Sequence, residues 1–213
     1  MVELTVKLIE IARATAAAGL SRGTAGNLSV RAPEGSGSDF LITPSGMACD
    51  TLTPEDICTV HFDGSCEGVR KPSSEWRVHR DLYATRPDAG AIVHAHPPFA
   101  TSLSCLRRDI PPFHYMVARF GGHNIRCSDY ATFGTQALSY AVLRAIEKRR
   151  GCLMANHGMI VAGQDLRHAF DLAIELEALC EQYWRACQLG PPVLLEPEEM
   201  AAVSDRFAGY GQP

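Results

Sequence analysis

Short apolar runs of strand length are interleaved irregularly with longer amphipathic segments, and this mixture most constrains the fold. The candidate strands are residues 27–30, 40–43, 57–62, 91–94, 152–154 and 159–161. Turn-rich residues 33–39 and 155–158 separate two pairs of these runs, which is typical of hairpins. No glycine-rich phosphate fingerprint follows the first strand, so a dinucleotide-binding fold is not expected. The pattern favours an α/β sandwich.

Helical periodicity fills most of the remaining chain. Apolar residues recur every three or four positions in residues 2–18, 73–85, 135–149, 165–188 and 198–207. Residues 165–188 form the longest periodic segment, and Pro97 and Pro98 begin a shorter helix. The chain shows no linker, repeat or low-complexity tract. We therefore expect a single domain spanning residues 1–213.

Composition and charge exclude several classes of protein. The 213-residue chain has a net charge of −4 and no basic stripe, so nucleic acid is not an expected partner. No run of 18 apolar residues is present, which argues against a membrane span. Charged residues interrupt the N-terminal apolar segment at helical spacing, unlike a signal peptide. The eight cysteines form no CxxC pair, so reduced thiols in a cytoplasmic protein are expected.

Two histidines end the strand at residues 91–94. His94 and His96 are two positions apart, so their side chains point to the same side of an extended chain. Such a pair can supply imidazole nitrogens to zinc. Two partly exposed histidines at a strand end would give the same spacing without a metal, and the spacing alone leaves both interpretations open.

A third histidine lies in the turn between the last two candidate strands. His157 follows Asn156 and precedes Gly158, more than sixty residues after His96. A lone histidine in such a turn is more often structural. Together with His94 and His96, however, it would complete a site of three protein nitrogens with an open position, which is the catalytic pattern for zinc.

The segment Lys71 to His79 carries an acid at a predicted helix start. Glu75 is expected in the first turn, where the positive end of the helix dipole alone could explain it. Alternatively, its carboxylate binds the metal or moves a proton to and from carbon. Ser73 and Ser74 offer hydroxyl and N–H groups at a helix N-terminus, which suits an anion. His79, one turn later, is expected to contact the residues of the site and not the metal itself.

Two glycine-containing turns are candidates for binding phosphate. Gly26 and Asn27 lie in GTAGNLS, and Ser45 and Gly46 lie in TPSG. Small residues leave backbone N–H groups accessible, which suits phosphate. Ordinary turns have the same composition, and neither stretch matches a Walker loop. Each turn by itself is only a weak indication of a phosphate site.

Seven short motifs, taken together in their order along the chain, resemble those of a known protein family. GTAGNLSVR, LITPSG, KPSSEWRVH, AIVHAHPP, HYMVARFGG, YATFGT and ANHG resemble the class II aldolase/adducin family nearly from end to end. The resemblance implies a three-layer α/β/α sandwich with a central, mostly antiparallel sheet. It also implies a homotetramer with active sites at the subunit interfaces.

The resemblance also implies residue roles. One Zn²⁺ per chain would be held by His94, His96 and His157, with Glu75 as a displaceable fourth ligand and as the catalytic acid/base. The implied phosphate-binding residues are Gly26, Asn27, Ser45, Gly46, Ser73 and Ser74. Tyr115 would come from a neighbouring subunit and handle the proton on the aldehyde oxygen. Phe133 and Tyr210 match positions that shape the aldehyde pocket.

The implied reaction is reversible aldol cleavage of a phosphorylated sugar. The motifs are most similar to those of enzymes acting on L-fuculose 1-phosphate, which implies dihydroxyacetone phosphate and an aldehyde such as L-lactaldehyde as products. A 5-deoxypentulose phosphate would fit as well. Metal-dependent cleavage suits this set, since a cation stabilises the negative charge left on the ketone fragment.

Other activities of the family stay open. Methylthioribulose-phosphate dehydratases and sugar-acid phosphate decarboxylases share the histidines and a similar glutamate. Ribulose-phosphate 4-epimerases carry aspartate where Glu75 stands. An adducin-like binding module without catalysis would be expected to lose the metal ligands, which this chain keeps. Ser45 in place of threonine, Asn156 in place of histidine and a long loop at 33–38 depart from the expected pattern.

Overall fold

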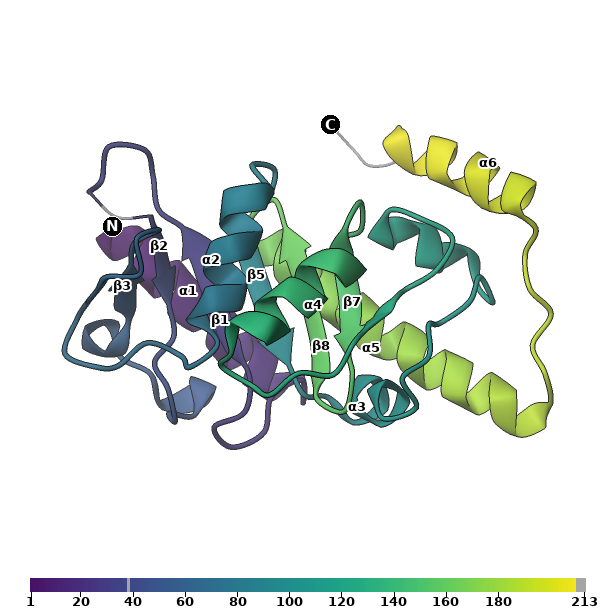
Figure 1. The fold of residues 1–213 in the computed structure, drawn as a ribbon, viewed down its shortest axis with the longest axis horizontal. Coiled ribbons are helices and arrows are strands. Elements are labelled where there is room, and N and C mark those ends of the chain that lie inside the picture. Colours follow the sequence, from purple (N-terminus) through teal and green to yellow (C-terminus); the bar gives the residue numbers. More distant parts are fainter. Residues whose placement is uncertain (38, 210–213) are drawn as a thin grey trace.

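The computed structural model describes residues 1–37 and 39–209, which form an eight-stranded sheet between two layers of helices (Figure 1). The strand order is β4-β3-β2-β1-β5-β8-β7-β6. The strands are β1 Asn27–Arg31, β2 Phe40–Ile42, β3 Cys58–Val60, β4 Cys66–Glu67, β5 Ala91–Ala95, β6 Cys127–Ser128, β7 Gly151–Met154 and β8 Gly158–Gly163. Neighbouring strands run antiparallel, except that β6 is parallel to β7.

Helices cover both faces of the sheet. They are α1 Val2–Ala17, α2 Trp76–Thr85, α3 Pro98–Ser104, α4 Gln136–Ile146, α5 Leu166–Leu189 and α6 Pro197–Ala208, with 3₁₀ helices η1 Cys49–Thr51, η2 Pro54–Asp56 and η3 Tyr115–Phe120. In Figure 1, α2 and α4 lie in front of the sheet, and α1 and α5 lie behind it. This arrangement confirms the expected α/β/α sandwich with a mostly antiparallel sheet.

Alternation along the strands divides the core into two apolar clusters. Val93 of β5 belongs to the cluster under α1 and α5. Ile92 belongs to the cluster under α2 and α4. Because side chains two positions apart share a face, His94 lies on the same side of β5 as Ile92. Burial of both faces holds His94 on a rigid sheet.

Both hairpins predicted from the sequence are present. β1 pairs antiparallel with β2, and β7 with β8. Strands β4 and β6 were not predicted, because each has only two residues and so shows no recognisable apolar run. The 3₁₀ helix η3, which carries Tyr115, was also not expected.

Helix α2 begins later than expected. It starts at Trp76, so Glu75 is the N-cap residue and does not lie in the first turn. The reason is a backbone pairing upstream: Ser73 donates to the carbonyl of Thr43, and Ser45 donates to the carbonyl of Lys71. These bonds hold the preceding segment extended. The carboxyl group of Glu75 therefore leaves the chain where the extended segment turns into the helix.

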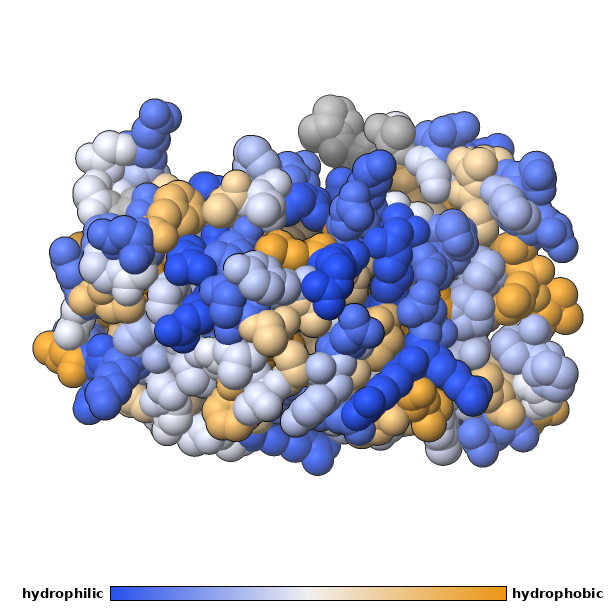
Figure 2. Space-filling model, viewed as in Figure 1, coloured by the Kyte–Doolittle hydropathy of each residue, from blue (hydrophilic) through white to orange (hydrophobic). Residues whose placement is uncertain are grey.

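The C-terminal helix is set apart from the sandwich. Figure 1 shows α6 at the end of a long connection from α5, and α6 packs against η3. Figure 2 shows apolar atoms at the end of the molecule where this connection runs. Leu189 and Val193 are 93% and 90% exposed. No helix within residues 1–37 and 39–209 is both long and apolar enough to cross a membrane.

Candidate active site

One pocket gathers most of the residues that the sequence analysis selected. Its volume is about 400 Å³. It is lined by Thr24, Ala25, Gly26, Asn27, Pro44, Ser45, Gly46, Ser73, Ser74, Glu75, His96, Tyr130, Ala131, Phe133, Asn156 and His157. The lining thus comes from the start of β1 and the segment before it, and from the segments that follow β2, precede α2, follow β5, join β6 to α4 and join β7 to β8. All six predicted phosphate-binding residues are among them.

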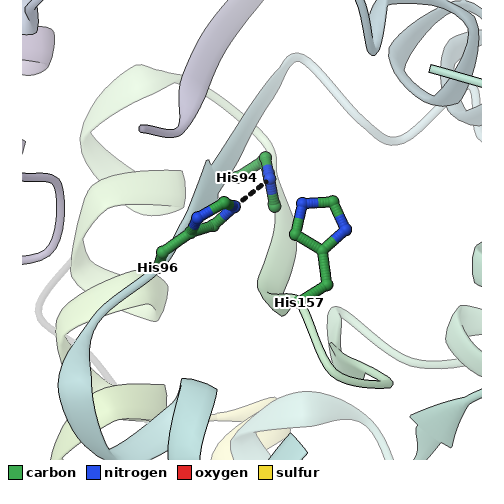
Figure 3. Close-up of side chains that lie close together, drawn as sticks. All are labelled: His94, His96 and His157. Carbon is green, nitrogen blue, oxygen red and sulfur yellow. Dashed lines mark hydrogen bonds between the residues drawn. The ribbon is translucent and has the colours of Figure 1, made fainter. Parts of the chain in front are cut away.

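The three histidines converge on one point (Figure 3). The ring centroids of His94 and His96 are 4.7 Å apart, those of His94 and His157 are 4.8 Å apart, and those of His96 and His157 are 4.7 Å apart. One nitrogen from each ring lies within 4.8 Å of the others. His94 is the last but one residue of β5, His96 directly follows the strand, and His157 lies in the β7–β8 turn. The structure therefore brings together the group expected to hold a metal.

A backbone contact fixes the orientation of the His94 ring. Its Nδ1 lies 2.8 Å from the carbonyl oxygen of Met159. Because a carbonyl can only accept, Nδ1 carries a proton that it donates. This leaves Nε2 as the nitrogen that faces the pocket, which is the usual way in which a second contact prepares a metal-binding histidine.

Glu75 lies directly beside the histidines. Its Oε2 is 3.0 Å from Nε2 of His94, and its Oε1 is 3.4 Å from Nε2 of His157. Asn27 donates from Nδ2 to Oε2 at 2.9 Å. The other oxygen, Oε1, is buried and accepts no hydrogen bond from the described residues. Although burial opposes ionisation, the charge of His94 and then His157 brings the pKa of Glu75 well below its ordinary value.

The donor set fits a divalent cation. Nε2 of His96 and Nε2 of His94 are only 2.9 Å apart, and a carboxylate oxygen lies equally close to His94. These three atoms are close enough together to ligate a single cation once the proton between them is displaced. Burial, followed by the charge of His94, lowers the pKa of His96 to about 3 and that of His157 to about 4. Both rings are thus neutral and able to ligate at neutral pH.

Close backbone packing shapes the phosphate side of the pocket. Gly26 has φ +84°, and a Cβ there would lie 2.7 Å from the carbonyl oxygen of His94 and 2.8 Å from Oγ of Ser21. Only glycine avoids both the strain and the contact. Gly46, with φ +72°, has open space around it. Gly26 therefore packs its turn directly against the backbone of His94. The two turns expected to bind phosphate, residues 23–29 and 43–46, are called the phosphate-side turns below.

Helix α3 is anchored immediately after His96. The carboxylate of Glu177 on α5 accepts hydrogen bonds from the N–H groups of Phe99 and Ala100, each at 2.8 Å. These are orphan donors of the first helical turn. Burial raises the pKa of Glu177. The contact fixes the direction in which the chain leaves His96, a link that the sequence alone did not reveal.

The residues expected to act at the aldehyde end do not all lie in the pocket. Phe133 lines the pocket. Tyr115 does not: it is 49% exposed and its ring stacks on Phe207 of α6. Tyr210 lies outside the described residues. Neither placement tests the proposed roles of these tyrosines.

Tyr130 and Asn156 also line the pocket, although the sequence analysis assigned them no role in the site. Tyr130 belongs to the quoted motif YATFGT, and Asn156 was noted only as a departure from the expected pattern. The Nε group of Arg107 donates to Oδ1 of Asn156 at 2.6 Å, and the Arg107 guanidinium lies 5.4 Å from the centre of the Tyr130 ring. Arg107 therefore joins the two residues along one wall of the pocket.

Comparison with known protein families decides the family. The model described as "Class II Aldolase and Adducin N-terminal domain" matches residues 6–184. The chain belongs to this family. The match includes all three histidines, Glu75 and the phosphate-side turns, so the resemblance inferred from the motifs is confirmed.

Individual class II aldolases are similar over nearly the whole chain. The 5-methylthioribulose-1-phosphate/5-deoxyribulose-1-phosphate aldolase of Rhodospirillum rubrum is 53% identical over 204 residues, which cover 96% of this chain and 90% of that protein. The L-fuculose phosphate aldolase of Escherichia coli K12 is 43% identical over 194 residues, covering 91% and 88%. A solved structure of an L-fuculose 1-phosphate aldolase superposes with a TM-score of 0.93 at 39% identity, covering 98% and 97%. The expectation of an enzyme of the class II aldolase type, an aldehyde-lyase, is confirmed.

Proposed function

We propose that this class II aldolase cleaves a ketose 1-phosphate reversibly into dihydroxyacetone phosphate and a small aldehyde. The observation that carries the proposal is the shared pocket: the two turns expected to bind phosphate, Glu75 and two of the three clustered histidines, His96 and His157, line one cavity of about 400 Å³. A phosphate held at one end fixes the position of the sugar carbons at the other end. Such positioning is a large part of what an enzyme contributes.

Zn²⁺, one per chain, is the proposed metal. His94, His96 and His157 would hold it, with Glu75 as a fourth, displaceable ligand, since three imidazoles and an open position suit zinc. When bound, the cation supplies Lewis-acid stabilisation of the negative charge that cleavage leaves on the ketone fragment.

Glu75 is the proposed acid/base. Cleavage leaves an electron pair on the carbon next to the carbonyl, and that carbon must then take a proton to become dihydroxyacetone phosphate. The buried oxygen Oε1 has no hydrogen-bond donor among the described residues, so it is the atom of Glu75 available to carry this proton. A positioned carboxylic acid can perform such a transfer.

Tyr115 is proposed to act from a neighbouring subunit. It lies outside the pocket of its own chain, and it is half exposed next to α6. A homotetramer with sites at its interfaces would bring this hydroxyl to the aldehyde oxygen of another subunit. The exposed apolar residues Leu189 and Val193 support such an assembly, because apolar surface of this kind is commonly covered by a partner. We expect the assembly to be cytoplasmic.

The aldehyde end of the substrate is proposed to be apolar. Phe133, Ala131 and Tyr130 present ring and methyl surface to the pocket. The Rhodospirillum rubrum relative is named for 5-methylthio and 5-deoxy sugars, whose terminal groups are apolar. We therefore favour a 5-deoxy- or 5-methylthiopentulose 1-phosphate. L-Fuculose 1-phosphate, which the motifs indicated, is the second candidate, supported by the superposition with an L-fuculose 1-phosphate aldolase.

A panel of ketose 1-phosphates tests the proposal. The zinc-loaded protein would be incubated with 5-methylthioribulose, 5-deoxyribulose, L-fuculose and unmodified ribulose 1-phosphates. Release of dihydroxyacetone phosphate would be followed by its reduction with NADH in a coupled assay. We expect release, with the highest kcat/KM for the two sugars with apolar ends. Dehydration of the sugar, or carbon dioxide from a sugar-acid phosphate, in place of this product would refute aldol cleavage.

A further inference from the structure

A buried line of hydrogen bonds runs from the sheet interior to Glu75. The hydroxyl of Tyr83 lies 2.8 Å from Oγ of Ser29, which lies 2.6 Å from Nδ1 of His79. On the other side of the ring, Nε2 of His79 lies 2.6 Å from Oδ1 of Asn27, whose Nδ2 donates to Glu75. All five residues are at most 7% exposed.

The carboxylate at the end gives this line one direction. Glu75 only accepts, so Asn27 must turn its NH₂ group toward it and its carbonyl toward His79. His79 must then carry a proton on Nε2. In the neutral ring Nδ1 is an acceptor, so Ser29 donates to it, and Tyr83 in turn donates to Ser29. The two hydroxyl protons and the ring N–H proton then each have one acceptor within the line.

The reverse assignment fails at Glu75. If His79 carried its proton on Nδ1, its Nε2 would need a donor, and Asn27 would have to turn its NH₂ group to the ring. The carbonyl of Asn27 would then face the carboxylate, and two buried acceptors would oppose each other. Complete burial, reinforced by the charge of His94, lowers the pKa of His79 to about 3, so the doubly protonated ring is excluded at neutral pH.

We propose that Ser29, His79 and Tyr83 are positioning residues that hold the amide of Asn27 in one orientation, so that Oε2 of Glu75 is occupied and Oε1 alone is free for proton exchange. None of the three lines the pocket, so they act through Asn27. The inference deepens the proposed function and rests on it. It predicts that breaking the line slows the proton step without weakening the binding of the phosphate.

Kinetics of Ser29→Ala test the inference. We expect kcat to fall about ten- to a hundredfold, as for loss of a buried hydrogen bond that acts on a charged group. KM and the metal content should stay close to wild type. Ser29→Thr keeps the hydroxyl on a strand and should restore most of kcat. Tyr83→Phe should lower kcat less than Ser29→Ala does, because Ser29 can still donate to His79.

Ser139→Ala is the matched control. Ser139 is also completely buried, and its hydroxyl bonds with Asp81 between α2 and α4, so the change removes an equivalent group outside the line. It should lower the melting temperature as Ser29→Ala does but leave kcat unchanged. Equal kcat in the two alanine variants, or no rescue by threonine, would overturn the inference.

A second measurement does not depend on turnover. Histidine-selective ¹⁵N labelling, followed by NMR of the wild-type protein, reports which ring nitrogen carries the proton; a His79→Gln spectrum assigns the signal. At pH 7 we expect His79 to be neutral with the proton on Nε2, with or without zinc. A proton on Nδ1, or on both nitrogens, would contradict the inference. If the protein cleaves no ketose 1-phosphate, the proposed function fails, while this spectrum still decides whether the line exists.

Discussion

Asn27 of β1 lies directly opposite His94 of β5 in the antiparallel pairing of the two strands. On the other side of β5, His94 is paired with Ile160 of β8, close to the turn that carries His157. Side chains opposite each other share one face of a sheet. The register of three strands therefore sets the distance between the phosphate-side turn and the histidine cluster.

Gly26→Ala tests how strongly this relationship depends on close packing. The new Cβ would meet the carbonyl of His94 and the hydroxyl of Ser21. We expect a loss of about 2–5 kcal/mol in the free energy of unfolding, combining left-handed strain with overpacking. Gly46→Ala, at a similar φ but with open space around it, should cost only roughly 1–2 kcal/mol. Urea denaturation measures both, and equal losses would argue against the contact with His94.

Glu75→Gln separates the acid/base role from metal binding. The amide cannot exchange the proton, so turnover should fall about 10²–10⁴-fold. The three histidines remain, so zinc content measured by mass spectrometry should stay near one ion per chain. Full activity in this variant would remove Glu75 from the mechanism.

Tyr115→Phe tests the contribution of a neighbouring subunit. The variant should cleave more slowly, with little change in KM, because the proposed role of the lost hydroxyl is at the aldehyde oxygen and not at the phosphate. The sharper experiment dissociates the Tyr115→Phe and Glu75→Gln proteins mildly into subunits, mixes them and lets them reassemble. Hybrid assemblies would contain some sites with both native residues, so activity should exceed that of either variant alone. No gain on mixing, with hybrids confirmed by native mass spectrometry, would place Tyr115 outside a shared site.

Metal affinity should depend on pH through His94. Burial disfavours the protonated ring, but Glu75 outweighs it and raises the pKa of His94 above its ordinary value of 6.5 in the metal-free protein. A raised pKa means that the proton is held more tightly, and the metal must displace it. Zinc affinity should therefore be constant well above this pKa and fall about tenfold per pH unit below it. Chelator competition measures this; constant affinity down to pH 5 would contradict the pairing with Glu75.

Sequence patterns predicted the fold class and the composition of the pocket because both depend on local features. Short apolar runs marked β1, β5 and β8, and the HxH spacing placed two histidines on one side of a strand. Motifs recognisable as belonging to one family added Glu75 and the phosphate-side turns. These patterns are properties of short segments, so they can be recognised without knowledge of the tertiary structure.

Long-range relationships were not predictable in this way. Glu75 is an N-cap residue because residues 43–45 hold the segment before it extended, a contact invisible in the local sequence. The line from Tyr83 through Ser29 to His79 requires both the register of β1 and the docking of α2 onto the sheet. Glu177 contacts α3 from a helix about eighty positions later in the chain. Each of these depends on packing between elements, which periodicity does not encode.

The most direct test of the account is a zinc titration of the metal-free protein, scored by release of dihydroxyacetone phosphate from 5-deoxyribulose 1-phosphate. We predict no release without metal, a linear rise with added zinc and a plateau at one ion per chain. In His157→Ala, neither stoichiometric binding nor activity should return. Full activity in the metal-free protein, or full activity restored to His157→Ala by stoichiometric zinc, would contradict a catalytic centre built on the three histidines.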